Sequence, residues 1–394
     1  MRKINKICFS IVALILAIIN FAFIPHQNKV NALTAEDLFS SFTSDSYVLM
    51  DSKSNTILYG KNAEQKMPVA SICKLMTTLL TLEKIDRGEL LLDEKLVASE
   101  YASSVEGSQA FLDAGSEYSV KDLLKSVIVA SANDSAIVLA EAIGGSEDNF
   151  VIMMNNRAKE LGMNNTLYSN STGLPKANQY STAIDTAILL NKVSKYDIYR
   201  QNCSIWIDTL VHPSGRETEL VNTNRLIKYY NNCKCGKTGF TDEAGYCLSA
   251  VAEKNDMNLI AVALNCETSA DRFKECMELF NYGFSNYENK KIVDKEMVLQ
   301  QEISVKGGKK ETTKLMVNKD FYIINKRGET NNIEIRYQLP SEIKAPCSSD
   351  TPIGKIIILK KGVVVGELDV YPICDIEKQT YGDILYKILK NWEL

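Results

Sequence analysis

The chain has 394 residues, of which 45% are hydrophobic and 24% charged, so it is long enough for two domains and has ample apolar material for their cores. This composition excludes disorder on a large scale. The formal net charge is −4, and removal of residues 1–32, which carry four basic residues and no acids, would make it −8. A nucleic-acid partner is therefore not expected.

The first 32 residues are predicted to be a signal peptide rather than part of the fold. Three basic residues open the chain, residues 11–23 form an almost unbroken apolar run, and the triplet VNA at 30–32 offers a small-residue cleavage site. A retained anchor helix is the alternative, but the run is shorter than the roughly 20 residues that span a bilayer. We therefore expect an exported protein, at the extracytoplasmic face of the cell membrane or in the cell wall.

Residues 33–285 are predicted to form one α+β domain. Strand patterns open and close this segment and helical patterns lie between them, which implies a largely antiparallel sheet with a helical part beside it. The predicted strands cover residues 47–51, 56–60, 239–254 and 256–266. The predicted helices cover residues 68–86, 121–130, 134–143, 149–162 and 269–284.

The predicted secondary structure changes near residue 290, from mixed helices and strands to short strands. Residues 290–373 are predicted to form a small all-β domain, because short strand patterns alternate with Gly, Pro, Asn and Asp. Residues 379–394 form an amphipathic helix, whose apolar side chains at helical spacing are Ile384, Leu385, Ile388, Leu389 and Trp392. Such a face can attach reversibly to a membrane surface, although the charges of the helix cancel and docking on its own domain is the alternative.

The cysteines and histidines argue against metal and triad chemistry. Nine of the ten cysteines follow residue 32, and this odd number, scattered inside apolar patterns, indicates reduced structural thiols rather than a disulfide framework. The Cys233-Lys234-Cys235 pair has no second pair to complete a metal site. His212 would be the only histidine of the mature chain, in a VHPSG stretch typical of a turn. A His-rich metal site is thus excluded, and no cofactor is implied.

The stretch VASICKLMTTLL, residues 69–80, places Lys74 three positions after Ser71. On a helix these residues lie one turn apart, so the hydroxyl and the amine can meet, and Pro68 indicates that Ser71 lies near the helix N-terminus. Burial among apolar neighbours can lower the pKa of Lys74 from about 10.4 to near 7, and a neutral lysine can accept the serine proton. The pattern predicts Ser71 as nucleophile and Lys74 as base, although S-x-x-K alone occurs often by chance.

Two further motifs supply what this pair lacks. Ser131-Ala132-Asn133 lies in a break between apolar helices, where a hydroxyl and an amide can project. Lys237-Thr238-Gly239 opens a strand whose glycine lets another segment lie close. Together they offer a proton relay, a hook for a substrate amide and a cation for a carboxylate, which are the parts needed for acyl transfer on a peptide. Lys237 is also a candidate for a second cation that lowers the pKa of Lys74.

With these motifs, the sequence resembles the low-molecular-mass penicillin-binding proteins that act as D-alanyl-D-alanine carboxypeptidases. Their S-x-x-K, S-x-N and K-T-G motifs stand here at residues 71–74, 131–133 and 237–239, in the same order and at comparable spacing. The stretches KELGMNNT, STGLP, YSTAIDTA, NTNRLI and KTGFTDEAGYCLSA are also typical of such enzymes. The resemblance covers nearly the whole mature chain and implies a penicillin-binding/β-lactamase-like transpeptidase domain followed by a small all-β domain.

The resemblance also implies a serine acyl-enzyme mechanism on peptidoglycan stem pentapeptides. Ser71 would attack the carbonyl between the two terminal D-alanines, Lys74 would take its proton, and Ser131 would pass a proton to the leaving nitrogen. The backbone N–H groups of Ser71 and Phe240 would form the oxyanion hole. Penicillin and other β-lactams would acylate Ser71 as mimics of the substrate.

On the binding side, the resemblance implies that Asn133 holds the substrate amide and that Lys237 and Thr238 bind the terminal carboxylate. Certain relatives carry an arginine inside the N-x-N segment, where this chain has Thr223, and Arg225 follows two residues later. The basic group that assists Lys237 is therefore left open. Cys73, directly before Lys74, is either an oxidation-sensitive thiol or a packing one.

Four other functions are weighed against this one. A class A β-lactamase shares the three motifs, and Glu160 with Asn164 matches its E-x-x-x-N pattern, but that class lacks a β-rich tail domain. A nucleotide-binding loop at CGKTG would need a glycine where Asn231 stands. A catalytically silent wall-binding protein and a peptidoglycan endopeptidase would keep the same fold.

Overall fold

The computed structural model describes residues 35–330 and 332–392, so the predicted signal peptide at 1–32 lies outside the described residues. The described residues fall into two units, one that ends at Phe42 and one that begins at Thr43. In the first unit, a short helix α2 (Ala35–Leu38) precedes Phe39 and Phe42, whose ring centroids lie 4.9 Å apart. Everything that follows belongs to the second unit.

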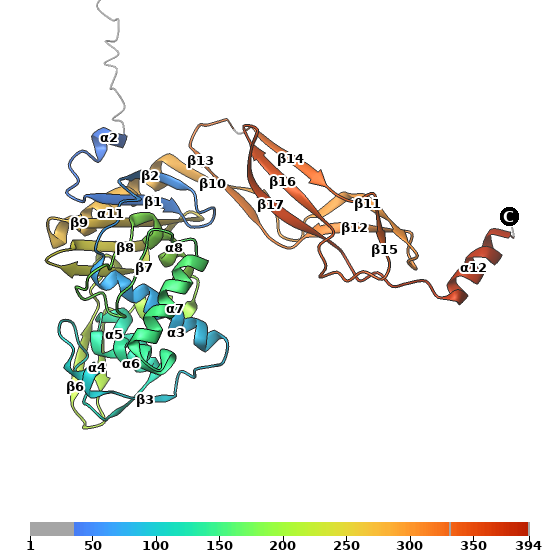
Figure 1. Cartoon of the computed structure of the whole chain (residues 1–394). Helices are drawn as coiled ribbons and strands as arrows, with labels where there is room; N and C mark the ends of the chain where they lie inside the picture. The colour runs from blue at the N-terminus through green and yellow to red at the C-terminus, as the bar shows by residue number, and fades with distance from the viewer. Residues whose placement is uncertain (1–34, 331, 393–394) are drawn as a thin grey trace, which may run out of the picture. The chain divides into compact units, whose positions relative to one another are not determined.

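A five-stranded antiparallel sheet, in the order β2-β1-β9-β8-β7, forms the centre of the first part of this unit (Figure 1). Its strands are β1 (Ser46–Asp51), β2 (Ile57–Lys61), β7 (Cys233–Thr241), β8 (Gly245–Lys254) and β9 (Met257–Cys266). The single strand predicted over 239–254 is therefore wrong, because the chain reverses between β7 and β8. Thr241 Oγ1 accepts a hydrogen bond from Ala244 N at 3.1 Å, and Gly245 has φ +61°, a turn conformation that favours glycine.

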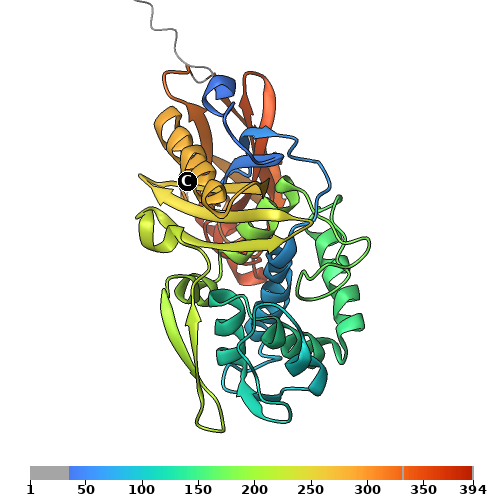
Figure 2. The same ribbon diagram turned by 90° about the vertical axis from the view of Figure 1, so that its left-hand side faces the viewer.

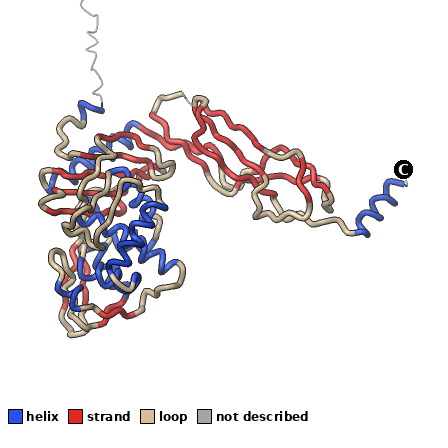
Figure 3. Tube along the Cα trace, viewed as in Figure 1, coloured by secondary structure: helices blue, strands red, loops and turns tan. Residues whose placement is uncertain are grey.

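The two faces of this sheet are covered by different helices. Helix α11 (Ser269–Asn286) packs on β8 and β9, and a side chain at its Gly283 would meet Leu49 and Leu259. Because strand side chains alternate, Val48 and Val262 point to the opposite face, where they join the core that contains helix α8 (Ala183–Val193). The prediction of an antiparallel sheet with a helical part beside it is confirmed (Figure 3).

The remaining helices lie between β2 and β7 in the chain. They are the 3₁₀ turn η1 (Ala70–Cys73) and helices α3 (Lys74–Asp86), α4 (Glu100–Ser104), α5 (Val120–Val129), α6 (Asn133–Gly144), α7 (Glu147–Glu160), α9 (Asp197–Cys203) and α10 (Leu226–Tyr229). Serine or threonine caps begin several of them, as when Ser119 Oγ accepts from Asp122 N at 3.1 Å. Helix α7 ends as expected before Gly162, which has φ +77°. The helix predicted from residue 68 instead starts with η1, because Ala70 has φ +47° and cannot be α-helical.

Two small antiparallel pairs complete this part: β3 (Lys95–Val97) with β4 (Glu117–Ser119), and β5 (Ile207–Val211) with β6 (Glu217–Val221). Figure 2 shows the β5–β6 hairpin beside the helical part. Its connecting turn contains His212, as predicted: His212 N donates to Arg216 O at 2.8 Å, and Gly215 N donates to His212 O at 2.9 Å.

The β-rich part follows α11 and has its own apolar core, which includes Leu315, Ile356, Ile358 and Val370. A six-stranded sheet has the order β14-β16-β17-β12-β11-β15, and β10 pairs with β13. The strands are β10 (Tyr287–Val293), β11 (Val298–Lys306), β12 (Thr312–Val317), β13 (Phe321–Lys326), β14 (Ile333–Gln338), β15 (Glu342–Lys344), β16 (Gly354–Lys360) and β17 (Val363–Pro372). Helix α12 (Tyr381–Trp392) follows, and no helix of the described residues is long and apolar enough to cross a membrane.

Candidate active site

Ser71 and Lys74 meet as their spacing predicts. Lys74 Nζ lies 2.8 Å from Ser71 Oγ and donates to the carbonyl oxygen of Thr172 at 2.7 Å. Lys74 is fully buried, whereas Ser71 is partly accessible. Burial lowers the pKa of Lys74 to about 7, although the nearby Cys73 and Asp134 oppose this shift. A lysine with this pKa is neutral in a large fraction of molecules near pH 7 and can take a proton from the hydroxyl.

The backbone around Ser71 is held in an uncommon conformation. Ala70, directly before it, has φ +47°, a region that alanine rarely occupies. Gly173 makes this possible, since a side chain there would come within 2.0 Å of Ala70 O. The loop that contains Gly173 and Thr172 therefore packs directly on η1 and supplies the carbonyl that Lys74 binds. Strain of this kind persists where the surrounding structure over-determines it, often at functional sites.

A second lysine–serine pair comes from two motifs that lie far apart in the sequence. Lys237 Nζ donates to Ser131 Oγ at 2.8 Å and to Thr238 O at 2.9 Å. Both residues are only 3% exposed. Ser131 has φ +63°, a non-helical conformation that separates helix α5 from helix α6. Burial, and next the repulsion from Lys74, lower the pKa of Lys237 well below its ordinary value. The two lysines therefore interact electrostatically within one buried site.

Asn133 presents an unsatisfied oxygen. Its backbone N–H donates to Ser108 O at 2.7 Å, and its Nδ2 donates to Glu106 O at 2.6 Å. Its Oδ1 is buried and has no hydrogen-bond partner in the structure. A buried amide oxygen without a partner costs free energy, and a ligand N–H would satisfy it.

The third motif lies on β7, the edge strand of the central sheet. A side chain at Gly239 would come within 2.5 Å of Val69 O, so only glycine lets β7 lie this close to the turn that carries Ser71. Thr238 Oγ1 donates to Thr223 Oγ1 at 2.7 Å. Phe240 follows, with its ring stacked on Tyr246 at 4.3 Å between centroids. The structure thus brings β7 against η1, and Lys237 of β7 into contact with Ser131.

Arg272 was missed by the sequence reasoning. Its Nη1 donates to Gly239 O at 3.1 Å and to Cys247 O at 3.4 Å, and its positive charge is a further cause of the lowered pKa of Lys237. Arg225, which the sequence offered as a helper of Lys237, is exposed. Nothing in the pattern of α11 distinguishes Arg272 from a surface arginine; only its three-dimensional position does so.

Other candidates from the sequence stand apart from this site. Cys73 is buried, its Sγ donates to Asn170 O at 3.3 Å, and burial raises its pKa to about 12, so it packs rather than reacts. Glu160 is bound by Arg157 Nη1 at 2.7 Å and its side chain is 63% exposed. His212 binds Tyr118 and not a serine of the site, as described below. All nine described cysteines are free, and no group of three or more potential metal ligands exists among residues 35–330 and 332–392.

Comparisons with known proteins agree with this geometry. Residues 31–268 match the D-alanyl-D-alanine carboxypeptidase family, and residues 287–378 match the C-terminal domain of penicillin-binding protein 5. The carboxypeptidase DacF of Bacillus subtilis is 35% identical over 348 residues, which are 88% of this chain and 89% of that one.

A D-alanyl-D-alanine endopeptidase of Pseudomonas aeruginosa is 34% identical over 231 residues, covering 57% of this chain and 73% of that one. The crystal structure of penicillin-binding protein 5 from Haemophilus influenzae superposes with a TM-score of 0.73 at 30% identity, covering 86% of this chain and 98% of that one. With both domains matched and the three motifs assembled around Ser71, the chain belongs to the D-alanyl-D-alanine carboxypeptidases, which are serine-type penicillin-binding peptidases.

Proposed function

We propose that Ser71 and Lys74 carry out the carboxypeptidase reaction, in which the last D-alanine is removed from peptidoglycan stem pentapeptides. The observation that carries this assignment is the 2.8 Å contact between Ser71 Oγ and a fully buried lysine amine with a pKa of about 7. A neutral amine at hydrogen-bond distance is what a serine needs in order to become a nucleophile near neutral pH.

The proposed acylation step begins with attack of Ser71 Oγ on the carbonyl carbon between the two D-alanines, while its proton passes to Lys74 Nζ. The negative charge that develops on the carbonyl oxygen is held by the backbone N–H groups of Ser71 and Phe240. The C–N bond then breaks as Ser131 delivers a proton to the nitrogen of the leaving D-alanine and takes in its place the proton that Lys74 had accepted, so both side chains return to their starting forms. Water hydrolyses the resulting ester and regenerates Ser71.

The binding residues complete the assignment. Asn133 Oδ1, which is buried without a partner, accepts an N–H from the substrate amide. Lys237 and Thr238 bind the terminal carboxylate. An anion beside Lys237 raises its pKa again, which opposes the lowering caused by burial and by Lys74. β-Lactams, which present a carboxylate and a reactive carbonyl, acylate Ser71 in the same position.

The test is release of D-alanine from a diacetyl-lysyl-D-alanyl-D-alanine peptide by the chain that begins at residue 33. We expect release by the wild-type protein and loss of both release and covalent penicillin labelling in the Ser71→Ala variant. Ser104→Ala, which changes an exposed serine of α4, is the matched control and should retain both. Penicillin labelling without D-alanine release would contradict the carboxypeptidase assignment and favour an endopeptidase or a wall-binding scaffold.

Two rival activities have separate readouts. A β-lactamase needs a carboxylate that activates the deacylating water, and its candidate Glu160 is bound by Arg157 and largely exposed. Slow release of penicilloate is therefore expected. Cleavage of a cross-linked muropeptide dimer would favour an endopeptidase, but the endopeptidase relative matches only 57% of this chain, whereas the carboxypeptidase DacF matches 88%.

We also propose that α12 attaches the exported protein to the outer surface of the cell membrane. Leu385, Ile388 and Leu389 are 59%, 52% and 54% exposed, so the apolar face of this helix is not covered in the structure. Burying such side chains in a lipid interface is favourable by about 1.5 to 3 kcal/mol each. Because Asp383 offsets one of the two lysines of the helix, a strong preference for anionic lipid is not expected.

Co-sedimentation of the chain from residue 33 with phosphatidylcholine vesicles tests this attachment. We expect binding by the wild-type protein, no binding by the Leu385→Asp/Leu389→Asp variant, and unchanged binding by Lys390→Gln, which alters the polar face. Equal recovery of all three proteins in the vesicle-free supernatant would reject membrane attachment and favour a helix that docks on its own domain.

A further inference from the structure

The β5–β6 hairpin connects the two sides of the active site. Asp208 of β5 pairs with Lys125 of α5 at 2.9 Å, and Thr223, directly after β6, donates from its N–H to Val129 O at 3.2 Å. Helix α5 leads into Ser131, while Thr223 also accepts the hydrogen bond from Thr238 of β7. The base of the hairpin is thus fixed to both the S-x-N and the K-T-G motifs.

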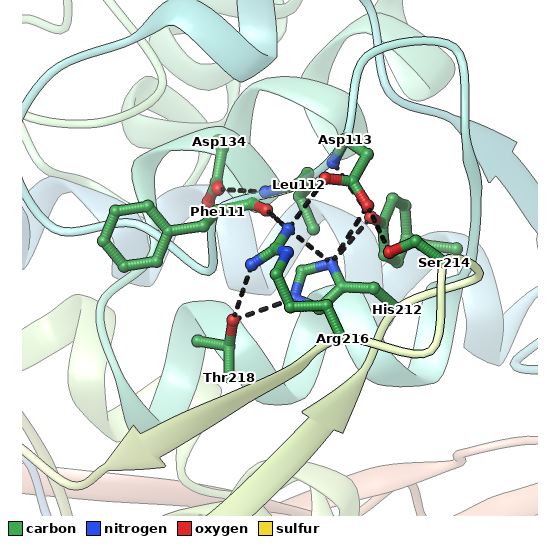
Figure 4. A network of polar contacts seen from close by, with 9 residues as sticks. Phe111, Leu112, Asp113, Asp134, His212, Ser214, Arg216 and Thr218 are labelled. Atoms are coloured by element: carbon green, nitrogen blue, oxygen red, sulfur yellow. Dashed lines mark hydrogen bonds and ion pairs between the residues drawn. The ribbon is translucent and has the colours of Figure 1, made fainter.

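The tip of the hairpin reaches a different segment, residues 106–113 (Figure 4). Arg216 Nη2 donates to Asp113 Oδ1 at 2.8 Å and also to the carbonyl oxygen of Phe111. Ser214 Oγ donates to Asp113 Oδ2 at 3.0 Å. Phe111 has φ +59°, a conformation that is unfavourable for phenylalanine and needs support from its surroundings. Arg216 provides that support by binding the carbonyl of this residue.

A buried histidine reinforces the same contact. His212 Nδ1 lies 2.8 Å from Tyr118 OH, which accepts from Asp113 N at 2.9 Å, and His212 Nε2 lies 2.8 Å from Thr218 Oγ1. Arg216 Nη2 also faces Nδ1 at 3.2 Å. The side chain of His212 is 0% exposed, and this buried hydrogen-bond chain fixes the hairpin tip and Asp113 together.

The opposite side of the 106–113 segment is bound to the S-x-N motif. Asp134 accepts hydrogen bonds from Ala110 N at 3.0 Å and Leu112 N at 3.1 Å. Its neighbour Asn133 is held by the carbonyls of Glu106 and Ser108. The segment therefore lies between Arg216 on one side and Asn133 on the other. The side-chain Nδ2 and the backbone N–H of Asn133 both donate to carbonyl oxygens of this segment.

We propose that Arg216 and Asp113 are positioning residues of the carboxypeptidase: their ion pair holds the 106–113 segment so that the carbonyls of Glu106 and Ser108 fix Asn133 with its free oxygen toward the substrate. This inference rests on the proposed role of Asn133. Neither member of the pair touches the reacting atoms. The pair is about 40% exposed, so its net effect on global stability is small, and its effect is instead on the geometry of the segment. Misplacement of a substrate-holding group by a fraction of an ångström slows the reaction without unfolding the protein.

The first experiment compares Arg216→Gln with Arg87→Gln in the chain from residue 33. Arg87 pairs with the exposed Glu89 and serves as the matched control. We expect Arg216→Gln to lower kcat/KM for the D-alanyl-D-alanine peptide, and the rate of penicillin acylation, by about tenfold, with partial recovery in Arg216→Lys. The control should stay within twofold of the wild type. Rates within twofold for Arg216→Gln would overturn the proposal.

A double-mutant cycle shows whether the effect passes through Asn133. In an Asn133→Ala background, Arg216→Gln should cause less than a twofold further loss, because the group that it positions is gone. A full tenfold loss in that background would show that Arg216 acts by another route and would overturn the proposal.

Hydrogen exchange gives a readout that does not depend on activity. The amides of Ala110, Leu112 and Asn133 should exchange faster in Arg216→Gln, while those of β8 and β9 should be unchanged. If these three amides stay protected, the ion pair does not hold the segment and the proposal fails, even if the proposed catalytic roles stand. A wild-type protein with protected amides but no peptidase activity would instead contradict the proposed function alone.

Discussion

The two lysines of the active site and the paired lysines of the β-rich part have opposite surroundings. Lys74 and Lys237 are fully or almost fully buried, and neither forms an ion pair with a carboxylate among the described residues. In the β-rich part, the paired lysines lie at the surface, as in the Lys355–Glu367 pair at 2.9 Å, where both side chains are about half exposed. A buried amine without a counter-charge costs free energy, whereas an exposed pair contributes little. This free-energy cost falls on the active site, where the reaction needs a lysine that is readily deprotonated.

The difference arises from what surrounds each amine. Lys74 donates to a serine hydroxyl and a backbone carbonyl, which are good partners for a neutral amine but do not compensate a full positive charge. Lys355 has a carboxylate beside it and water around it, and its pKa is raised by the hydrogen bond to Glu367. Substitutions at these two lysines should therefore have very different consequences.

The largest effect is expected for Lys74→Met. This variant removes the base and keeps a side chain of similar length, so penicillin acylation and D-alanine release should fall by at least about 10³-fold. Lys355→Met, the matched change in the β-rich part, should leave both rates unchanged. Rapid labelling of the Lys74→Met variant by fluorescent penicillin in a stopped-flow assay would show that another group activates Ser71.

The pH profile should reveal the same lysine. Because the neutral form of Lys74 is the base and its pKa is about 7, kcat/KM should fall about tenfold for each pH unit below 7 and reach a plateau above it. An ordinary lysine would instead give activity that still rises beyond pH 9. Initial rates of D-alanine release between pH 5 and 9 distinguish the two outcomes.

Part of this site could be predicted from the sequence because it depends on local geometry. The contact between Ser71 and Lys74 follows from their spacing, and the apolar neighbours of Lys74 indicate its burial. The Thr172 carbonyl and Arg272 could not be predicted, because tertiary packing brings them from segments about 100 and 200 residues away from Lys74. The same holds for the carbonyls that bind Asn133.

The fold shows the same division. The helices and strands that were predicted lie close to their observed bounds, whereas helix α8 and the β5–β6 hairpin were not predicted. The turn between β7 and β8 was also missed, because DEAG contains only a weak turn signal beside an apolar run. The 3₁₀ start at Ala70 was also missed, since its positive φ is made possible by the close approach of Gly173, about 100 residues away. Local sequence patterns thus predicted helices and strands, whereas long-range contacts determine the backbone conformation next to Ser71.

The pH dependence of the free energy of unfolding should also distinguish Lys74 from an exposed lysine such as Lys355. The folded-state pKa of Lys74 is below its unfolded value of 10.5, so between pH 7 and 10.5 the unfolded chain holds a proton that the folded chain lacks. Wild-type stability therefore gains about 1.4 kcal/mol per pH unit from this site as the pH rises, and Lys74→Met gains nothing. From pH 7 to 9.5, the stability of the variant relative to wild type should fall by about 3 kcal/mol in urea unfolding. A constant difference would mean that Lys74 keeps its proton in the folded protein.

The smallest effect is expected for the exposed pair of the β-rich part. Replacing Glu367 by Gln or Lys355 by Met removes one ion pair whose partners are 47% and 48% exposed. Solvent screens the pair and each side chain regains conformational freedom, so the midpoint of urea unfolding should shift little, and less at high salt. The effect of the double variant should equal the sum of the effects of the two single ones within the error of the measurement. A clear departure from additivity would mean that this surface is not screened by water, and that burial alone does not separate its lysines from those of the active site.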